Sequence, residues 1–438
     1  MKLNVLALAL LGLSVGQACL LPEEIDQDGF NGERGFVRRQ SGNGLAIGTG
    51  DRFNGGSTVI RGLGSQASGT TLASILNVNE VKSAFDSLVK AYGVQSFTAP
   101  YKTYNGASVF GGQIGTCPQV YFNAAIHARE RGSSDNLLYF LGDLLYANQT
   151  GTGLTYGSKS FTNAEVKKAL SVGIVFLPLS NPDGVAYDQS SNSCWRKNRN
   201  PASSGGSASR IGVDLNRNFD FLWDFPSLFA SSAASSVAST SPSSETYHGT
   251  SAFSEPETKN IKWVMDENTG VHWFVDIHSY AGDVLYSWGS DTDQGTTPAM
   301  NFLNSAYNTK RGVIPDSGSA VYSEYISSTD STNVKNAASR MSSAMTAATG
   351  RSYTSMQAAA LYPTSGASDD YSYSRTFADS SLNKIHGFTL EFGFSNNAAS
   401  CPFYPSATQY QQSIRETGAG FMAFLLAAAD IGNGGNTC

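Results

Sequence analysis

Hydrophobic residues follow two different periods along this chain, and these periods predict both strands and helices. Runs rich in β-branched and aromatic residues predict strands at 109–114, 120–126, 172–179, 271–277 and 388–392, and the apolar runs at 172–179 and 271–277 are typical of buried strands. Apolar residues at helical spacing predict helices near 79–92, 136–145, 163–170, 255–268 and 411–429. Because strands alternate with helices, we expect an α/β fold, a single globular domain with a central mixed, mostly buried β-sheet flanked by helices.

Two polar segments interrupt this pattern. Residues 227–244 are nearly all serine and alanine, which predicts a low-complexity surface loop. Residues 291–355 are long and polar, and we expect an insertion that carries short helices of its own.

The amino-terminal part of the chain has the features of an export signal. Lys2 precedes an apolar run, and Gly16 and Ala18 are small residues at the two positions that a signal peptidase reads. We therefore expect a signal peptide at 1–18 and a secreted, extracellular protein. Residues 19–65 lack an apolar period, which predicts a short propeptide or disordered leader. Within it, the pair Arg38-Arg39 is either a processing site or simply solvated.

Composition narrows the possible partners. Charged residues make up 15% of the chain and the formal net charge is −6, so no basic surface suggests nucleic acid. The apolar runs at both ends are too short to span a bilayer, so we expect no membrane association. We also expect a monomer. Cys19 directly follows the expected cleavage point, and the other four cysteines allow two disulfides in any of three pairings: Cys117, Cys194, Cys401 and Cys438.

The strongest candidate chemistry lies where the predicted strand 120–126 ends. His127 and Glu130 follow it, and the predicted helix 136–145 begins shortly afterwards. An imidazole and a carboxylate three residues apart can converge on one ion, and mixed nitrogen and oxygen ligation suits zinc. Of the remaining histidines, His278 is best placed for a third ligand because it ends another buried strand. The others are His248, His272 and His386.

Seven short motifs occur in an order that resembles the funnelin zinc carboxypeptidases, the family of pancreatic carboxypeptidases A and B. The motifs are His127-Ala128-Arg129-Glu130, Asn181-Pro182-Asp183-Gly184, Trp195-Arg196-Lys197, the segment 212–218, His278-Ser279-Tyr280, the segment 362–371 and Thr389-Leu390-Glu391. The resemblance runs from about Asn79 to Ile414, and it implies that residues 66–438 form a metallocarboxypeptidase catalytic domain.

The resemblance also implies roles for single residues at the reacting centre. One zinc ion per chain would be held by His127, Glu130 and His278. Glu391 matches the general base, a carboxylate that can take a proton from water and pass it to the leaving amine. Arg196 matches the cation that stabilises the developing oxyanion.

Recognition of the substrate is implied by a second group of residues. Asn216 and Arg217 match the pair that binds the terminal carboxylate, and a planar guanidinium suits this task because it can donate two parallel hydrogen bonds. Tyr362 matches the residue that closes over that carboxylate. Arg129 and Tyr280 match subsite residues further along the peptide.

Asp369 falls at the family position at the base of the specificity pocket. An acidic residue there accompanies cleavage of carboxy-terminal lysine or arginine, because an apolar side chain would leave the buried charge unpaired. The motif departs from the commonest pancreatic form at Ala367, where glycine is usual, and at Tyr371, where tryptophan is usual.

The sequence thus predicts a secreted zinc-dependent exopeptidase that acts on the C-termini of peptides and proteins and prefers basic terminal residues. One alternative is the same enzyme with an apolar or broad preference. A second is a catalytically silent binding protein on this fold, although Glu391, Arg217 and the metal ligands are all present. A third is a related zinc hydrolase that acts on other amides.

Overall fold

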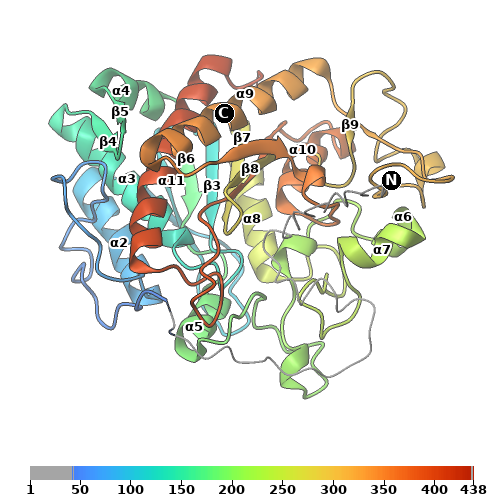
Figure 1. Ribbon diagram of the computed structural model, residues 1–438, viewed down its shortest axis with the longest axis horizontal. Helices are drawn as coiled ribbons and strands as arrows, with labels where there is room; N and C mark the ends of the chain where they lie inside the picture. The colour runs from blue at the N-terminus through green and yellow to red at the C-terminus, as the bar shows by residue number, and fades with distance from the viewer. Residues whose placement is uncertain (1–41, 43, 436–437) are drawn as a thin grey trace, which may run out of the picture.

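In the computed structural model, residues 42, 44–435 and 438 are described, and an eight-stranded sheet lies at the centre of the molecule (Figure 1). The strand order is β1-β2-β6-β3-β7-β12-β8-β11. In that order the strands span Gln95–Thr98, Phe110–Ile114, Ile174–Leu177, Val120–Ala124, Trp273–His278, His386–Glu391, Asp283–Tyr286 and Thr354–Gln357. Two small two-stranded sheets add β4 (Leu154–Tyr156) with β5 (Lys159–Phe161) and β9 (Asp293–Gln294) with β10 (Glu324–Tyr325).

The sheet is mixed, and its centre is parallel. β6, β3, β7 and β12 run in one direction, whereas β2 and β8 pair antiparallel with β6 and β12. Every residue of β3, β6, β7 and β12 is buried. This is why these strands read as continuous apolar runs, and it confirms the predicted α/β class.

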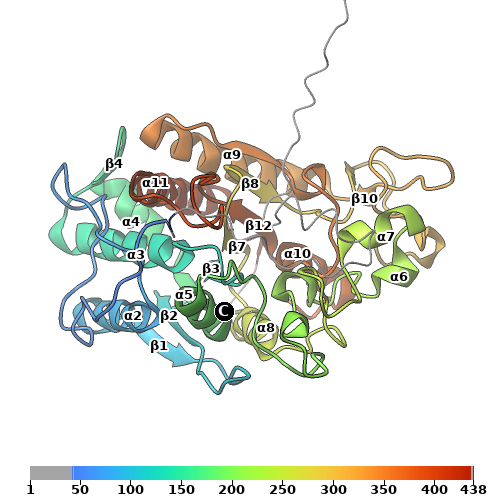
Figure 2. The same ribbon diagram turned by 60° about the horizontal axis from the view of Figure 1, so that its bottom comes forward.

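Helices cover both faces of the sheet. Figure 2 shows α3, α4, α9 and α11 on one side and α5, α8 and α10 on the other. The α-helices span Val78–Tyr92 (α2), Ser133–Thr150 (α3), Asn163–Ser171 (α4), Pro182–Ser191 (α5), Phe225–Leu228 (α6), Ser231–Val237 (α7), Pro256–Glu267 (α8), Ser328–Thr349 (α9), Ser368–Ala378 (α10) and Ala407–Ile431 (α11). Short 3₁₀ turns lie at Ala208–Arg210, Leu215–Arg217, Ser305–Tyr307 and Ala358–Ala360.

Helix α11 is packed against the sheet by aromatic side chains. Phe421 lies 5.1 Å from Phe122 of β3 and Phe424 lies 5.1 Å from Phe388 of β12, measured between ring centroids. Its apolar end is therefore a buried helix, as predicted. Among the residues described, none of the helices is both long and apolar enough to cross a membrane.

The ends of α2 illustrate how the sequence sets an element boundary. The side chain of Asn77 accepts a hydrogen bond from the backbone N–H of Glu80, and the Glu80 side chain accepts one from the Asn77 N–H. This capping box satisfies two donors that the first turn leaves open. Gly93 ends the helix with φ of 69°, a conformation that suits glycine because it has no Cβ.

Residues 44–65 differ from the leader that we expected to extend to residue 65. Phe53, Ile60 and Leu63 are buried in the core, and the Leu45 N–H donates to the Pro405 carbonyl at 2.7 Å. These isolated apolar residues fill gaps between helices without following a period of their own, so the pattern could not reveal them. The proposed signal peptide at 1–18, and the leader where it covers residues 19–41, lie outside the described residues.

The two polar segments are also more ordered than their composition indicated. Residues 227–244 contain helix α7, which buries Ala233 and Val237. The segment 291–355 ends in the 22-residue helix α9, longer than the short helices expected, which buries Met341 and Met345. Because α9 packs with alanine and serine as well as methionine, its apolar period is weak in the sequence.

Two disulfides join distant parts of the chain. Cys117 pairs with Cys438, and Cys194 pairs with Cys401. The first ties the end of the chain to the approach to β3. The second joins the segment just before Arg196 to the segment after β12, so it supports one side of the candidate site.

Candidate active site

Three parallel strands bring the candidate metal and base residues to one edge of the sheet. His127 lies in the turn that follows β3, His278 is the last residue of β7 and Glu391 is the last residue of β12. Glu391 and His278 are direct partners in the register of β12 with β7. The carboxyl ends of parallel strands meet at a common edge, and this explains how residues far apart in sequence converge.

A tight turn holds His127 and Glu130 in place. Gly132 has φ of 100°, and this left-handed conformation redirects the chain into α3. The hydroxyl of Ser133 donates to the Ile277 carbonyl at 2.7 Å and accepts from the Ala125 N–H at 2.9 Å. This serine therefore fixes the turn between the ends of β3 and β7.

The side chains of His127, Glu130 and His278 form a compact, buried triad. Nδ1 of His127 lies 2.8 Å from Oε1 of Glu130, and Nδ1 of His278 lies 3.1 Å from Oε2. The two Nδ1 atoms are 3.0 Å apart. A tetrahedral ion with bonds of about 2.0–2.1 Å separates its ligands by roughly 3.3 Å. The spacing and the donor set of two imidazoles and one carboxylate therefore fit zinc.

Each histidine of the triad is held from behind by a carboxylate. Asp214 Oδ1 lies 3.0 Å from Nε2 of His127, and Asp276 Oδ2 lies 3.2 Å from Nε2 of His278. Such outer carboxylates fix the tautomer, so that Nδ1 is left to bind a metal.

We did not predict these two roles from the sequence. Asp214 stood in a motif without an assigned function. Asp276 lies inside a strand that is otherwise largely apolar. An isolated acidic residue in a buried strand was the feature of the sequence that could have indicated its role.

Neighbouring cationic groups lower the pKa of two buried acids in the site, Glu130 and Asp214. Burial on its own would raise the pKa of Glu130, but the adjacent His127 and His278 outweigh it and hold this pKa well below its usual range. Burial acts in the same way on Asp214, and the Arg196 guanidinium more than reverses it, so the pKa of Asp214 is strongly lowered.

Arg196 is fully buried and is anchored by the same carboxylate that supports His127. Its Nη2 and Nε donate to Asp214 Oδ2 at 2.9 and 3.2 Å. The Arg196 cation is therefore fixed beside the metal triad.

The guanidinium of Arg217 is buried with an unused donor. Nε donates to the Val237 carbonyl at 2.8 Å and Nη1 to the Asn216 carbonyl at 2.7 Å. Within the described part of the chain, Nη2 has no hydrogen-bond partner, and the residue is only 1% exposed. The Tyr362 ring centroid lies 5.9 Å from the guanidinium carbon. A buried cationic donor left open in this way is suited to an anionic ligand.

Asp369 lies in the first turn of α10 and is fully enclosed. Its Oδ1 accepts from the Asp370 N–H at 2.9 Å, and its Oδ2 accepts from the Thr389 hydroxyl at 3.0 Å. Burial raises the pKa of Asp369, and the negative charge of Asp276 adds to the rise.

Arg129 and Tyr280 meet at an aromatic surface beside the triad. The Arg129 guanidinium lies 4.4 Å from the Phe403 ring centroid, and the Tyr280 and Phe403 centroids are 4.7 Å apart. We did not predict a role for Phe403 from the sequence, since it lies in a segment without a recognisable pattern.

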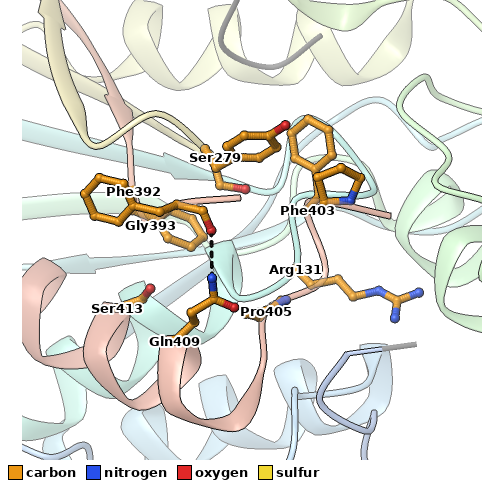
Figure 3. Close-up of a pocket in the computed structure, with 11 residues that line it drawn as sticks. Arg131, Ser279, Phe392, Gly393, Phe403, Pro405, Gln409 and Ser413 are labelled. Carbon is orange, nitrogen blue, oxygen red and sulfur yellow. Dashed lines mark hydrogen bonds between the residues drawn. The ribbon is translucent and has the colours of Figure 1, made fainter. Parts of the chain in front are cut away.

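Figure 3 shows the pocket that this aromatic surface borders. Ser279 and Phe403 lie on one side of the pocket, and Gln409 of α11 lies opposite and donates to the Phe394 carbonyl at 3.2 Å. The pocket is small and open to solvent. It adjoins the metal triad, because Ser279 directly follows His278 and its N–H lies 3.3 Å from Glu130 Oε2.

Comparisons with known proteins agree with this geometry. Carboxypeptidase A2 of Rattus norvegicus is 31% identical over 175 residues, 40% of this chain and 36% of that protein. Carboxypeptidase A1 of Homo sapiens is 31% identical over 222 residues, 48% of this chain and 47% of that protein. The chain therefore matches between about a third and a half of the length of these relatives.

The fold itself has solved counterparts. The crystal structure of carboxypeptidase A from Helicoverpa armigera superposes with a TM-score of 0.56 and 23% identity, covering 82% of this chain and 74% of that one. A family model for zinc carboxypeptidases matches residues 97–420, a range that includes the triad, Arg196, Arg217 and Glu391. With most of its length matched and a triad that fits the metal, the chain belongs to the zinc carboxypeptidase family.

Proposed function

We propose that this protein is a zinc-dependent exopeptidase that hydrolyses the C-terminal peptide bond of peptides and proteins. The observation that carries the proposal is the buried guanidinium of Arg217, whose Nη2 has no hydrogen-bond partner among the described residues. A free C-terminal carboxylate is an anion of suitable size and shape for this donor. The nearby triad of His127, Glu130 and His278 supplies the place for the metal.

The chemistry of hydrolysis is divided between the metal and the chain. Zinc, when bound by the triad, supplies Lewis-acid chemistry that polarises a carbonyl group and makes water more acidic. Glu391 takes the proton from the attacking water and delivers it to the nitrogen of the leaving amine. Arg196, fixed by Asp214, stabilises the negative charge that develops on the carbonyl oxygen.

Recognition of the chain end explains why only the last peptide bond is cut. Asn216 and Arg217 bind the terminal carboxylate, and Tyr362 closes over it. Arg129 and Tyr280 contact the peptide on the other side of the scissile bond. Fixing the carboxylate at one end places the preceding peptide bond at the metal centre.

We further propose a preference for C-terminal lysine or arginine. Asp369 is buried, and its raised pKa reflects a charge that the surroundings only partly compensate. A cationic side chain of the substrate beside Asp369 would supply the missing compensation, whereas an apolar one would not. The two disulfides are typical of exported proteins, so we propose that the enzyme acts outside the cell. We also propose that it acts as a monomer.

Mass spectrometry of matched peptides tests this function. The purified protein is incubated with peptides that differ only in a terminal Lys, Arg, Leu or Phe, each as the free acid and as the C-terminal amide. We expect loss of one Lys or Arg from the free acids, no cleavage of the amides, and no activity after chelation of the metal. Glu391→Gln, which cannot act as a base, is the catalytic control.

Each other outcome changes the proposal in a defined way. Trimming of Leu or Phe in preference to Lys would retain the exopeptidase and refute the role of Asp369. Cleavage of the amides would refute the role of Arg217. No cleavage of any peptide by the zinc-loaded protein would favour a catalytically silent binding protein.

A further inference from the structure

Asp276 is a carboxylate buried within the central strand β7. It is 0% exposed, and three polar groups surround it. The side-chain amide of Asn123 donates to Oδ1 at 2.8 Å, and the hydroxyl of Ser368 donates to Oδ2 at 2.6 Å. The third group is the His278 imidazole, whose Nε2 lies 3.2 Å from Oδ2. Burying a charge costs free energy unless neighbouring groups donate hydrogen bonds to it or carry the opposite charge. The contacts of Asp276 therefore indicate which groups it supports.

The strand geometry directs Asp276 to the metal triad. Side chains two residues apart on a strand point to the same face, so Asp276 and His278 lie side by side. Because Nε2 of His278 faces the carboxylate, Nδ1 faces Glu130 and His127. Asp276 thus lies beside the ring nitrogen that faces away from the triad, where a carboxylate favours the tautomer that leaves Nδ1 able to bind a metal.

Ser368 extends this contact to the loop that carries Arg217. While its hydroxyl binds Asp276, its N–H donates to Oδ1 of Asn216 at 2.8 Å. The Asn216 N–H in turn donates to Asp214 Oδ1 at 3.1 Å, and Asp214 supports the other histidine, His127. Hydrogen bonds therefore connect Asp276 with Asp214 behind the candidate metal site, and each of these carboxylates lies close to Nε2 of one metal histidine, at 3.2 Å for His278 and 3.0 Å for His127.

We propose that Asp276 is a positioning residue for the metal centre and that Ser368 holds Asp276 in the orientation that His278 requires. The inference rests on the zinc chemistry proposed above. Ser368 begins α10, the helix that also carries Asp369, so the specificity pocket and the metal centre share one support. Asp276 acts through His278 and touches neither the peptide nor the reacting atoms.

Zinc affinity, measured by competition with a chromophoric chelator in the absence of peptide, tests this proposal. We expect Asp276→Asn to weaken zinc binding about 10–100-fold, the range for loss of an outer-shell partner. Ser368→Ala should weaken it severalfold. In the double variant the loss should match that of Asp276→Asn within about twofold, because Ser368 acts only through Asp276. Ser374→Ala is the matched control, since Ser374 is a buried serine of the same helix whose hydroxyl, among the described residues, bonds only the Tyr371 carbonyl.

A spectroscopic readout separates positioning from a general loss of stability. With cobalt in place of zinc, the visible spectrum reports ligand geometry, and we expect it to shift in Asp276→Asn and to stay unchanged in Ser374→Ala. Thermal unfolding of the metal-free variants shows whether each is folded, and if Asp276→Asn does not fold, Ser368→Ala still tests the proposal.

Zinc affinity and a cobalt spectrum of Asp276→Asn that both match those of the parent would overturn the role of Asp276. Additive losses in the double variant would overturn the link through Ser368. A parent that binds zinc but trims no peptide would refute the proposed function and leave this inference intact. A parent protein that binds no zinc would refute both the proposed function and this inference.

Discussion

At the scale of single residues, the site is defined by charged groups that have been removed from water and left with specific partners. Arg196 and Asp214 bond one another, whereas Nη2 of Arg217 has no partner in the part of the chain that the structure describes. Because a buried, unpaired donor is costly, its presence is more informative than a well-satisfied ion pair. Substitution of such residues should change recognition more than it changes the fold.

Arg217→Gln tests the open donor. Loss of a charged hydrogen bond corresponds to about 1.5–3 kcal/mol, so we expect kcat/KM for free-acid peptides to fall roughly 10–100-fold. Steady-state kinetics on a peptide ending in Lys measures the effect. Arg210→Gln, at an exposed arginine on a nearby 3₁₀ turn, should leave kcat/KM within about twofold of the parent. An equal loss in both variants would contradict the role of Arg217.

Asp369 should make specificity depend on pH. Burial raises the pKa of this carboxyl above its ordinary value of 3.8, so it is protonated over a wider acidic range. The ratio of kcat/KM for Lys over Leu peptides should therefore fall as pH decreases through the raised pKa. In Asp369→Asn the ratio should be low and independent of pH. A ratio that tracks pH equally in both proteins would assign the titration to another group.

At the scale of elements, predictability depended on how each element is buried. Strands β3, β7 and β12 are covered on both faces, and their continuous apolar runs were recognisable in the sequence. β11 is partly exposed and has no such run, and α9 buries mostly small residues, so neither gave a clear period.

The pairing of the cysteines depends on the folded chain and could not be read from their spacing. The same holds for the partner of Asp276, because the hydroxyl of Ser368 lies 92 residues away in the sequence. The candidate metal ligands were recognisable because strand ends and short motifs mark them. The carboxylates behind them were not, because only the register of the sheet brings them together.

The Cys194–Cys401 disulfide should affect stability and peptide binding together. Replacing both cysteines by serine should lower the free energy of unfolding by about 2–4 kcal/mol, the usual range for such cross-links. It should also raise KM for longer peptides, since Cys401 lies two residues from Phe403, which packs on Arg129 and Tyr280. Denaturant unfolding and steady-state kinetics measure the two effects.

The second disulfide provides a matched comparison. Replacing Cys117 and Cys438 by serine removes a cross-link that also closes a long loop, since these cysteines are 321 positions apart in the sequence and Cys194 and Cys401 are 207 apart. We expect a comparable loss of stability and an unchanged KM. A raised KM in this variant would show that the cross-links act on the site only through general stability.

At the scale of the whole molecule, several buried acids set how stability varies with pH. Burial raises the pKa of both Glu257 and Glu324 to about 8, although Asn198 and the Tyr322 hydroxyl partly offset it. The folded protein therefore holds these protons more tightly than the unfolded chain, whose glutamates titrate near 4.5. Their contribution to stability is complete below the unfolded pKa and is lost as pH rises through about 8.

Unfolding by guanidinium at pH 6 and pH 9 measures this effect. We expect the free energy of unfolding to be lower at pH 9, and Glu324→Gln to reduce the difference by on the order of 1 kcal/mol. Gln409→Glu, at a partly exposed helix terminus, serves as a control for a changed charge and should leave the difference nearly unaltered. A larger difference in Glu324→Gln would contradict the raised pKa.

The register of β3, β7 and β12 also has a consequence for folding. His127 and His278 are separated by 151 residues, and the unfolded chain keeps them apart, so the complete ligand set exists only after the central strands have paired. Zinc would therefore bind the native state alone and add its binding free energy to stability through mass action. Capture of the metal during refolding would report the time at which the sheet is assembled. The bound metal would then stabilise the paired strands only at a late stage of folding.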